Sequence, residues 1–534
     1  MFTRNLLLTF DGVGKAVTLD KERPEATAIL IEGSRIGKVG SRDELETILP
    51  SGSARLNLNR AFAYPGLVDS HGHIRSLGQS MKMVRLDDMH SYRQVVDHVK
   101  KRSQEIPKGT WIQGRNWNQE NWGTRDFPTH ELLSMEVPDH PVWLTRVDGH
   151  AGIANSKAME IAGVTDSTPS PNGGMVGSKD GKLTGLFLDV AMSLIRTSIP
   201  PITVDQAKSM ILDAQEACLK SGLTEVHDAG IGLTELRAYQ ELESEGRLKL
   251  RVYAMQDKES FDKGPWEIFA DSPDDRLFTC RSLKIIYDGA LGSRGAAMFE
   301  EYSDSPGESG FTLISEEHLT ETISRALSVG FQVNIHAIGD RANHEALNAI
   351  ERAIKEYPGS DHRSRIEHAQ NIVSTDIMRF KELGVIASVQ PAHCTSDMLM
   401  AERRLGEARL SAAYPWRILL DNAIRVVSGS DFPVESEKPM WGIYSAVTRQ
   451  THSQYPNGGW QPQQRMTVNE ALQSFTTEAA FARFMESEKG MIKEGMLSDM
   501  TILDRDIRGI SPEEILSVEV LATIVNGEFV YQSF

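Results

Sequence analysis

Two histidines separated by a single residue, His71 and His73, form the first chemical signal in the sequence. They follow a short apolar run that is typical of a β-strand. Side chains two residues apart lie on the same face of a strand, so both rings can converge on one ion. Imidazole is a common ligand of zinc. The chain contains 15 histidines, however, so a single pair with this spacing indicates little by itself.

Four more polar residues stand at or near the ends of other apolar runs: Lys284, His336, His368 and Asp431. Apolar runs of this length are typical of buried strands, and an unpaired charge inside a buried strand is energetically expensive. Imidazole and carboxylate groups on several strands are explained if they share a divalent metal ion. We therefore predict a site for one or two divalent ions per chain, with zinc as the expected metal.

Lys284 is unusual in this set because an ammonium group repels a cation. Two interpretations remain open from the residues alone. Lys284 pairs with Asp288 or Asp431 as a structural lysine, or CO2 converts its side-chain nitrogen into a carbamate. A carbamate is anionic and offers two oxygen ligands, which could bridge two metal ions.

The elements that must position these residues alternate between helix and strand through the middle of the chain. Residues 203–221 carry a helical apolar face, stop at Gly222 and lead into an apolar strand; similar units follow. Repeated units of this kind predict a parallel sheet covered by helices. We expect an α/β fold with a (β/α)8 TIM-type barrel. Its predicted strands are 66–69, 223–226, 250–254, 283–286, 332–335, 365–367, 385–389 and 425–428.

The remaining segments define the predicted domains. The gap between the first two strands is too long for a crossover, so residues 76–200 are expected to form an insertion near the active-site mouth. Both chain ends contain β-hairpin patterns, including Asn526-Gly527 between two apolar runs. We expect residues 1–65 and 490–534 to form one small β-sandwich-like domain beside a barrel of residues 66–489. Two unrelated hairpins are the alternative.

Composition narrows the classes of partner. The chain has 534 residues with 57 Lys and Arg against 74 Asp and Glu, a net charge of −17, which argues against nucleic-acid binding. No charge-free stretch is long enough to predict a membrane span. Three cysteines, far apart in the sequence, favour a reducing compartment, and we expect a cytoplasmic protein. Self-association into a homo-oligomer is left open.

Longer motifs surround the candidate residues, and together they resemble the amidohydrolase superfamily. Within it, the chain resembles the YtcJ-like group, which includes N-substituted formamide deformylases. The most specific part of the resemblance is the combination of DGALGSRGA with HAIGDRAN. The motifs are YPGLVDSHGHI (64–74), RVDGHAGIANSKAM (146–159), TEVHDAG (224–230), LKIIYDGALGSRGA (283–296), QVNIHAIGDRAN (332–343), RIEHAQ (365–370), GSDFPVE (429–435) and GMLSDMTILDRD (495–506).

The resemblance implies a barrel with a small composite β domain and assigns the ligands. His71 and His73 would hold a first metal with Asp431 beside it. Lys284, carbamylated, would bridge to a second metal held by His336 and His368, and no ligand position departs from the pattern.

The expected activity is hydrolysis of a C–N bond in a small N-substituted amide or formamide by a metal-bound hydroxide. Asp431 would first accept a proton and then return it to the departing amine. His227 and His150 are further candidates for substrate binding, although each could be a packed histidine. Deamination or ester hydrolysis at the same site is an alternative, and so is a regulatory or binding protein without turnover.

Overall fold

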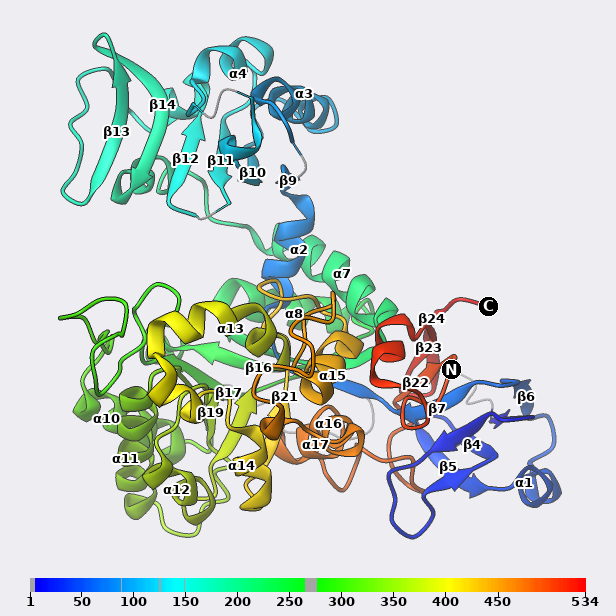
Figure 1. The fold of residues 1–534 in the computed structure, drawn as a ribbon. Helices are drawn as coiled ribbons and strands as arrows, with labels where there is room; N and C mark the ends of the chain where they lie inside the picture. Colours follow the sequence, from blue (N-terminus) through cyan, green and yellow to red (C-terminus); the bar gives the residue numbers. More distant parts are fainter. Residues whose placement is uncertain (1–4, 88, 124–125, 148, 265–275) are drawn as a thin grey trace. The chain divides into compact units, whose positions relative to one another are not determined.

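Eight parallel strands form the sheet that carries the predicted site (Figure 1). The structure, a computed structural model, describes residues 5–87, 89–123, 126–147, 149–264 and 276–534. All eight predicted strands are present, and the fold is of the TIM-type α/β class. In sheet order they are β8 (Leu67–Gly72), β15 (Leu223–Ile231), β16 (Arg251–Asp257), β17 (Phe278–Ile286), β18 (Gln332–Ala337), β19 (Arg365–His368), β20 (Ile386–Val389) and β21 (Val426–Ser428).

The first and last of these strands meet at their carboxyl ends. The backbone N–H of Asp431 donates to the carbonyl of His71 at 2.7 Å, and the N–H of His73 donates to the carbonyl of Phe432 at 2.9 Å. Gly429 permits this approach, because a Cβ atom there would lie 2.4 Å from the backbone nitrogen of His71. The closure therefore brings the segment after β21 directly against the histidine pair.

Helices cover the outer side of the barrel strands, as α10, α11, α12 and α14 show in Figure 1. In α10, Leu319, Ile323 and Leu327 are buried at the predicted helical spacing. Its first turn is capped by the Ser315 side chain, and the chain leaves it through Gly330 at φ 76°. The helices that follow the barrel strands are α7 (Val204–Lys220), α8 (Leu233–Ser244), α9 (Lys258–Lys263), α10 (Glu316–Ser328), α11 (Asp340–Glu356), α12 (Ile377–Glu382), α13 (Pro391–Leu405), α14 (Trp416–Asp421), α15 (Pro439–Thr448), α16 (Val468–Ser474) and α17 (Thr477–Ala482).

Strands from the two chain ends share one six-stranded sheet. Its order is β24-β23-β22-β7-β2-β3, and the central pair β22 and β7 runs antiparallel. A four-stranded sheet, β5-β4-β1-β6, accompanies it. That these two sheets form a domain separate from the barrel stays a prediction. The bounds are β1 (Leu6–Thr9), β2 (Lys15–Val17), β3 (Glu25–Ala26), β4 (Ala28–Glu32), β5 (Arg35–Gly40), α1 (Arg42–Ile48), β6 (Ala54–Asn57), β7 (Phe62–Pro65), β22 (Met500–Leu503), β23 (Val520–Val525) and β24 (Glu528–Gln532).

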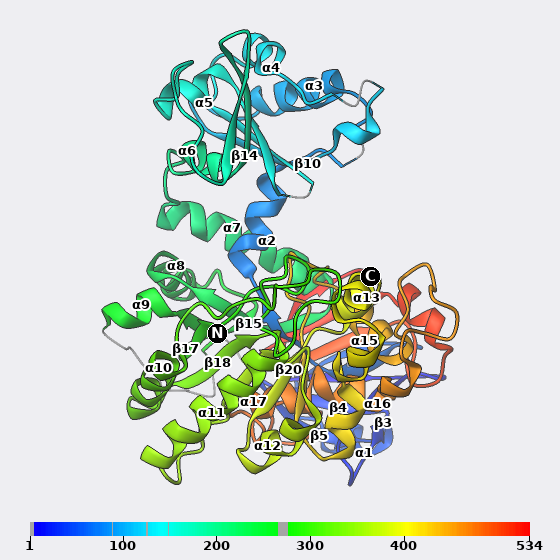
Figure 2. The ribbon, with the colours of Figure 1, turned by 60° about the vertical axis from the view of Figure 1, so that its left-hand side comes forward.

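The chain divides into two compact units. That residues 76–200 are an insertion near the active-site mouth stays a prediction. The first unit comprises Met1–Leu77 and Val204–Phe534, and the second is Gly78–Thr203. The second unit contains a six-stranded sheet beside short helices (Figure 2). Its elements, with the helix that leads into it, are α2 (Ile74–Lys82), β9 (Val84–Arg85), α3 (Tyr92–Ser103), β10 (Ile112–Trp117), α4 (His130–Glu136), β11 (Val142–Arg146), β12 (Ala151–Ala154), α5 (Ser156–Ile161), β13 (Gly174–Lys179), β14 (Lys182–Asp189) and α6 (Ser193–Arg196).

None of the helices within the described residues combines the length and the apolar character that a bilayer crossing requires.

Candidate metal centre

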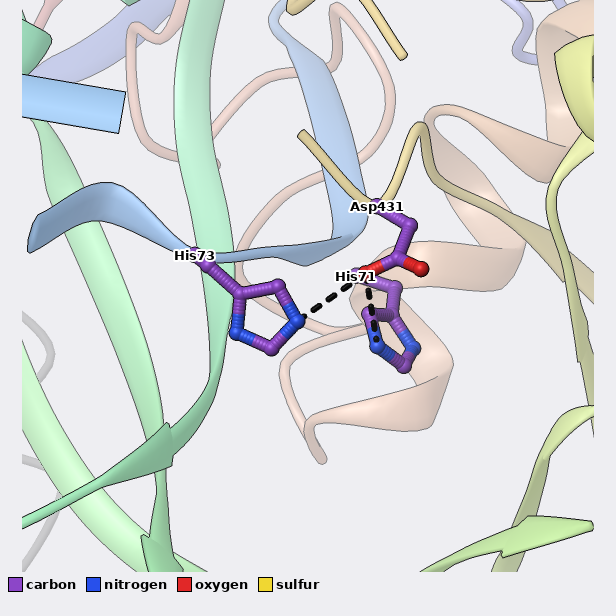
Figure 3. A group of neighbouring side chains, drawn as sticks. All are labelled: His71, His73 and Asp431. Carbon is purple, nitrogen blue, oxygen red and sulfur yellow. Dashed lines mark ion pairs between the residues drawn. The ribbon is translucent and has the colours of Figure 1, made fainter. Parts of the chain in front are cut away.

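The histidine pair points at one carboxylate, as Figure 3 shows. His71 lies near the carboxyl end of β8, His73 follows the strand, and Asp431 follows β21. Asp431 Oδ1 lies 2.9 Å from Nε2 of His73 and 3.5 Å from Nε2 of His71. The alternation of side chains along the strand thus brings both rings to the same atom.

The other three predicted ligands lie around the same point. The rings of His71 and His368 have centroids 5.0 Å apart, and those of His336 and His368 are 4.4 Å apart. Lys284 Nζ donates a hydrogen bond of 3.0 Å to His71 Nε2. The structure therefore brings all six side chains, from five barrel strands or the segments that follow them, into one cluster.

The backbone is strained at two members of this cluster. His368 has φ 76° and Asp431 has φ 59°, which are left-handed values that residues with a Cβ atom rarely adopt. Each such residue costs about 1–3 kcal/mol, and strain of this kind concentrates at functional sites. The fold holds these two side chains in place against their local preference.

Burial lowers the pKa of three histidines, His71, His336 and His368, and keeps them neutral. It lowers the pKa of His71 to about 4 and that of His336 to about 3, and the nearby Lys284 charge acts in the same direction. The pKa of His368 is also held well below its ordinary value, mainly by burial. Neutral imidazole is the form that binds metal ions, so the rings are ready to coordinate at neutral pH.

Two residues that sequence reasoning did not assign fix the orientation of the rings. Glu367 Oε2 is in close contact with His71 Nδ1, and Gln390 Oε1 accepts from His368 Nδ1 at 2.7 Å. In both rings this leaves Nε2 as the atom that faces the cluster. Partners of this kind set the tautomer of metal-binding histidines. The sequence offered one signal for each of them. Glu367 directly precedes the predicted ligand His368, and Gln390 directly follows the seventh strand.

A further histidine, His393, completes a second group that the sequence analysis did not predict. Within the part of the chain that the structure describes, two sets of three residues have ligand atoms within 4.8 Å of one another: His71, His73 and Asp431, and His368, His393 and Asp431. Among the described residues, Nε2 of His336 and Nε2 of His393 are buried without a hydrogen-bond partner. Neutral imidazole nitrogens that lack a hydrogen-bond partner and lie near a carboxylate are suitable ligands for a divalent metal ion.

The two predicted substrate-binding histidines have partners of their own. The predicted second strand ended at Val226, but β15 continues to Ile231, so His227 lies within the strand and is fully buried. Its ring nitrogens lie 3.0 Å from Arg365 Nη1 and 3.2 Å from Glu225 Oε1. His150 belongs to the second unit, where its Nδ1 is 2.8 Å from Asp189 Oδ1 at an exposed position. A role for either residue in substrate binding stays a prediction.

Comparison with known proteins agrees with this geometry. The chain is 31% identical over 526 residues to the putative amidohydrolase YtcJ of Bacillus subtilis strain 168, with 97% of this chain and 98% of the relative covered. It is 26% identical to the N-substituted formamide deformylase of Arthrobacter pascens, with 96% of each chain covered. A solved structure of an uncharacterized metal-dependent hydrolase from Pyrococcus furiosus matches with a TM-score of 0.80 at 30% identity, covering 95% of this chain and 100% of that one.

The model of the amidohydrolase family matches residues 56–531, a span that contains every residue of the cluster. The chain belongs to the amidohydrolase family and is a metal-dependent hydrolase.

Proposed function

We propose that this protein hydrolyses the C–N bond of a small N-substituted amide or formamide. The observation that carries the proposal is the convergence of His71, His73 and Asp431 on one point at the carboxyl end of the barrel. This is where enzymes with this fold place their active sites. The match to a protein named N-substituted formamide deformylase, over 96% of the chain, supports this choice of bond.

Zinc is the metal that we propose for the centre, because imidazole nitrogens and a carboxylate oxygen are its usual ligands in hydrolases. When bound, a divalent ion supplies a Lewis acid that polarises a carbonyl group and lowers the pKa of water.

Asp431 is the residue that we assign to proton transfer. Burial alone would raise the pKa of its carboxyl group, but interactions with His71 and His73 hold that pKa well below its usual range. The carboxylate is therefore ionised at neutral pH and can accept a proton from the attacking water. The same group then donates this proton to the amine nitrogen as the C–N bond breaks.

Lys284 is proposed to carry a carbamate. The residue is 6% exposed, and burial lowers the pKa of its amine, which favours the neutral form that reacts with CO2. In the reaction the amine nitrogen forms a bond to the carbon of CO2 and releases one proton. The resulting carbamate is an anionic group. It would stand where the Lys284 amine now hydrogen-bonds to Nε2 of His71.

The surroundings of the ligands favour a substrate with an apolar substituent. Ile286 pairs with His336 in the barrel register and is 56% exposed. Val434 follows Asp431 in the same turn and is 69% exposed. We propose that these two residues form part of the surface that receives an N-alkyl or N-aryl group.

A panel of matched substrates tests this proposal. Zinc-loaded protein, supplied with bicarbonate, is assayed with N-benzyl and N-butyl formamides and acetamides, the matching formate and acetate esters, and aminopurines. Amine release from the amides, faster than turnover of the esters or aminopurines and lost in Asp431→Asn, is the expected result.

Preference for the ester series would instead assign the site to ester hydrolysis, and ammonia release from the aminopurines would assign it to deamination. A metal-loaded protein that turns over none of these compounds would contradict the proposed activity and favour a non-catalytic role.

A further inference from the structure

A cavity of about 550 Å³ lies among the helices that cover the barrel, and the proposed activity makes no use of it. Its wall comes from the first turn of α11, from α12, from the end of α13 and from α14, all labelled in Figure 1, and from segments that follow β17 and β19. The residues that line it include no member of the candidate metal centre. The cavity is therefore a separate feature of the first unit.

The wall of this cavity is largely apolar. Ile372, Ile377 and Leu405 are buried side chains of the wall, and Met378 beside them is 43% exposed. Cavities of this volume with mainly apolar walls accommodate small molecules, and a few polar groups then fix the orientation of the ligand. The polar groups of the wall therefore decide which kind of molecule fits.

Asp340 is a wall residue with one carboxylate oxygen left over. It is 7% exposed and lies in the first turn of α11. Its Oδ1 accepts hydrogen bonds from the backbone N–H of Phe299 at 2.9 Å and of Arg341 at 2.8 Å. Its Oδ2 has no hydrogen-bond or ion-pair partner among the described residues. Burial raises the pKa of this carboxyl group, a cost that a bound cation would offset.

Asn371 offers a second acceptor on the same side. It is 1% exposed, and its Nδ2 donates at 2.9 Å to the carbonyl of Ile338, two residues before Asp340. Within the described part of the chain, its Oδ1 is buried without a hydrogen-bond partner. A ligand that donates hydrogen bonds would satisfy both Oδ1 of Asn371 and Oδ2 of Asp340.

Arg409 is the cationic residue of the wall, and the fold already uses its charge. Its guanidinium donates to the backbone carbonyls of Leu405 and Glu301, each at 2.8 Å. The wall also contains Glu300, an exposed carboxylate. Two carboxylates beside one committed guanidinium favour a cation over an anion in the cavity.

We infer that this cavity binds a small ammonium ion that carries an alkyl or aryl substituent. The ammonium group would donate to Asp340 Oδ2, with Asn371 Oδ1 as a further acceptor, and the substituent would lie against the apolar wall. Hydrogen bonds between charged groups are about twice as strong as those between neutral groups. The amine that the proposed reaction releases belongs to this class, although the cavity would bind it whether or not the protein catalyses that reaction.

Calorimetric titration of the metal-loaded protein with benzylammonium, benzyl alcohol and benzoate tests this inference. Benzylammonium should bind at a site that Asp431→Asn retains, about tenfold or more tightly than benzyl alcohol, and benzoate should not bind there. Asp340→Asn keeps an oxygen for the backbone contacts but removes the charge, so it should weaken benzylammonium binding by about 10- to 100-fold. Met378→Trp should obstruct the cavity and prevent binding, whereas Met135→Trp, a substitution of an exposed methionine in the second unit, should bind as wild type does.

Wild-type crystals soaked in a brominated benzylammonium give a result that depends on no variant, because an anomalous bromine peak beside Met378 and Ile418 is expected. Peaks confined to the barrel mouth, no binding by wild type in solution, or benzoate binding as tight as that of benzylammonium would overturn the inference. A cavity peak without binding in solution would show binding at crystal concentration only and would overturn it as well. Failure of the proposed activity has a different signature, since it would appear as normal binding of benzylammonium in the cavity with no turnover of amides.

Discussion

Two buried polar clusters lie at opposite ends of the barrel strands, and they differ in how their charges are satisfied. The mouth cluster consists of His71, His73, Lys284, His336, His368, His393 and Asp431. The floor network consists of Glu225, Arg251, Arg483, Lys489 and Asp499, near the amino ends of β15 and β16 and in the segments packed against them.

In the floor network each carboxylate meets cations from the protein itself. Glu225 lies 2.7 Å from Arg483 and in close contact with Lys489, and Asp499 lies 3.0 Å from Arg251. In the mouth cluster, Nε2 of His336 and Nε2 of His393 are buried without hydrogen-bond partners among the described residues. The paired charges of the floor network satisfy one another within the protein. The buried imidazole nitrogens of the mouth cluster lack such a partner, which is expected of atoms that bind a ligand.

The first test removes the carboxylate of the mouth cluster. Asp431→Asn should lower kcat by about a thousandfold, the usual scale for loss of acid–base catalysis. Its thermal midpoint measured without metal should stay near that of wild type, because the strained cluster contributes little to stability. The comparison variant is Asp376→Asn, a buried aspartate that pairs with His344 and Arg379. Asp376→Asn should lose stability and keep kcat. The reverse result would erase the contrast between a carboxylate that pairs with an arginine, Asp376, and one that faces only histidines, Asp431.

The second test removes a carboxylate from the floor network. Glu225→Gln leaves Arg483 and Lys489 without their shared counter-charge in a site that is fully buried. Removing one partner of a buried pair costs about 3–5 kcal/mol, so chemical denaturation should show a loss of that size. At temperatures where the variant is folded, its metal content should equal that of wild type. A variant as stable as wild type would show that the floor network does not stabilise the barrel.

The third test asks whether a metal ion fills the unpaired donors. An ion present at about 100 times its dissociation constant stabilises the folded state by about 2.7 kcal/mol. Chelation should therefore lower the thermal midpoint of wild type, and zinc should restore it. His73→Ala should show a reduced shift. Glu225→Gln, although less stable, should keep the full metal-dependent shift, and equal shifts in the two variants would contradict the assignment of the mouth cluster.

The eight strands could be predicted because apolar runs and glycine stops are local signals. The convergence of the six predicted side chains, without His393, followed from them, since the carboxyl ends of parallel strands in a barrel meet at one face.

The remaining features depend on contacts between residues distant in sequence. Glu367 was visible only as a neighbour of His368, and its proximity to His71 requires the register of β19 against the rest of the barrel. His227 was placed at the end of the second strand, yet β15 continues to Ile231 and buries both His227 and Asp228. Gln390 and His393 follow a strand whose local pattern contains no histidine pair, so no spacing rule identified them.

The last test concerns Glu367, which joins the two clusters. Its Oε2 contacts His71 Nδ1, and its Oε1 lies 2.8 Å from Arg365 Nε. Arg365 in turn contacts His227, which contacts Glu225 of the floor network. If its main role is to hold the His71 tautomer, Glu367→Gln should weaken metal binding by about 10- to 100-fold, which calorimetric titration with zinc measures.

If Glu367 acts mainly as the counter-charge of Arg365, the same variant should instead lose stability as Glu225→Gln does and bind metal normally once folded. Glu367→Asp distinguishes the roles further, because it keeps the charge for Arg365 but shortens the reach to His71. A loss of metal affinity in Glu367→Asp with little loss of stability would place Glu367 with the mouth cluster. Glu367 would then serve metal binding, and Arg365 would be the first residue of the chain of contacts that serves stability.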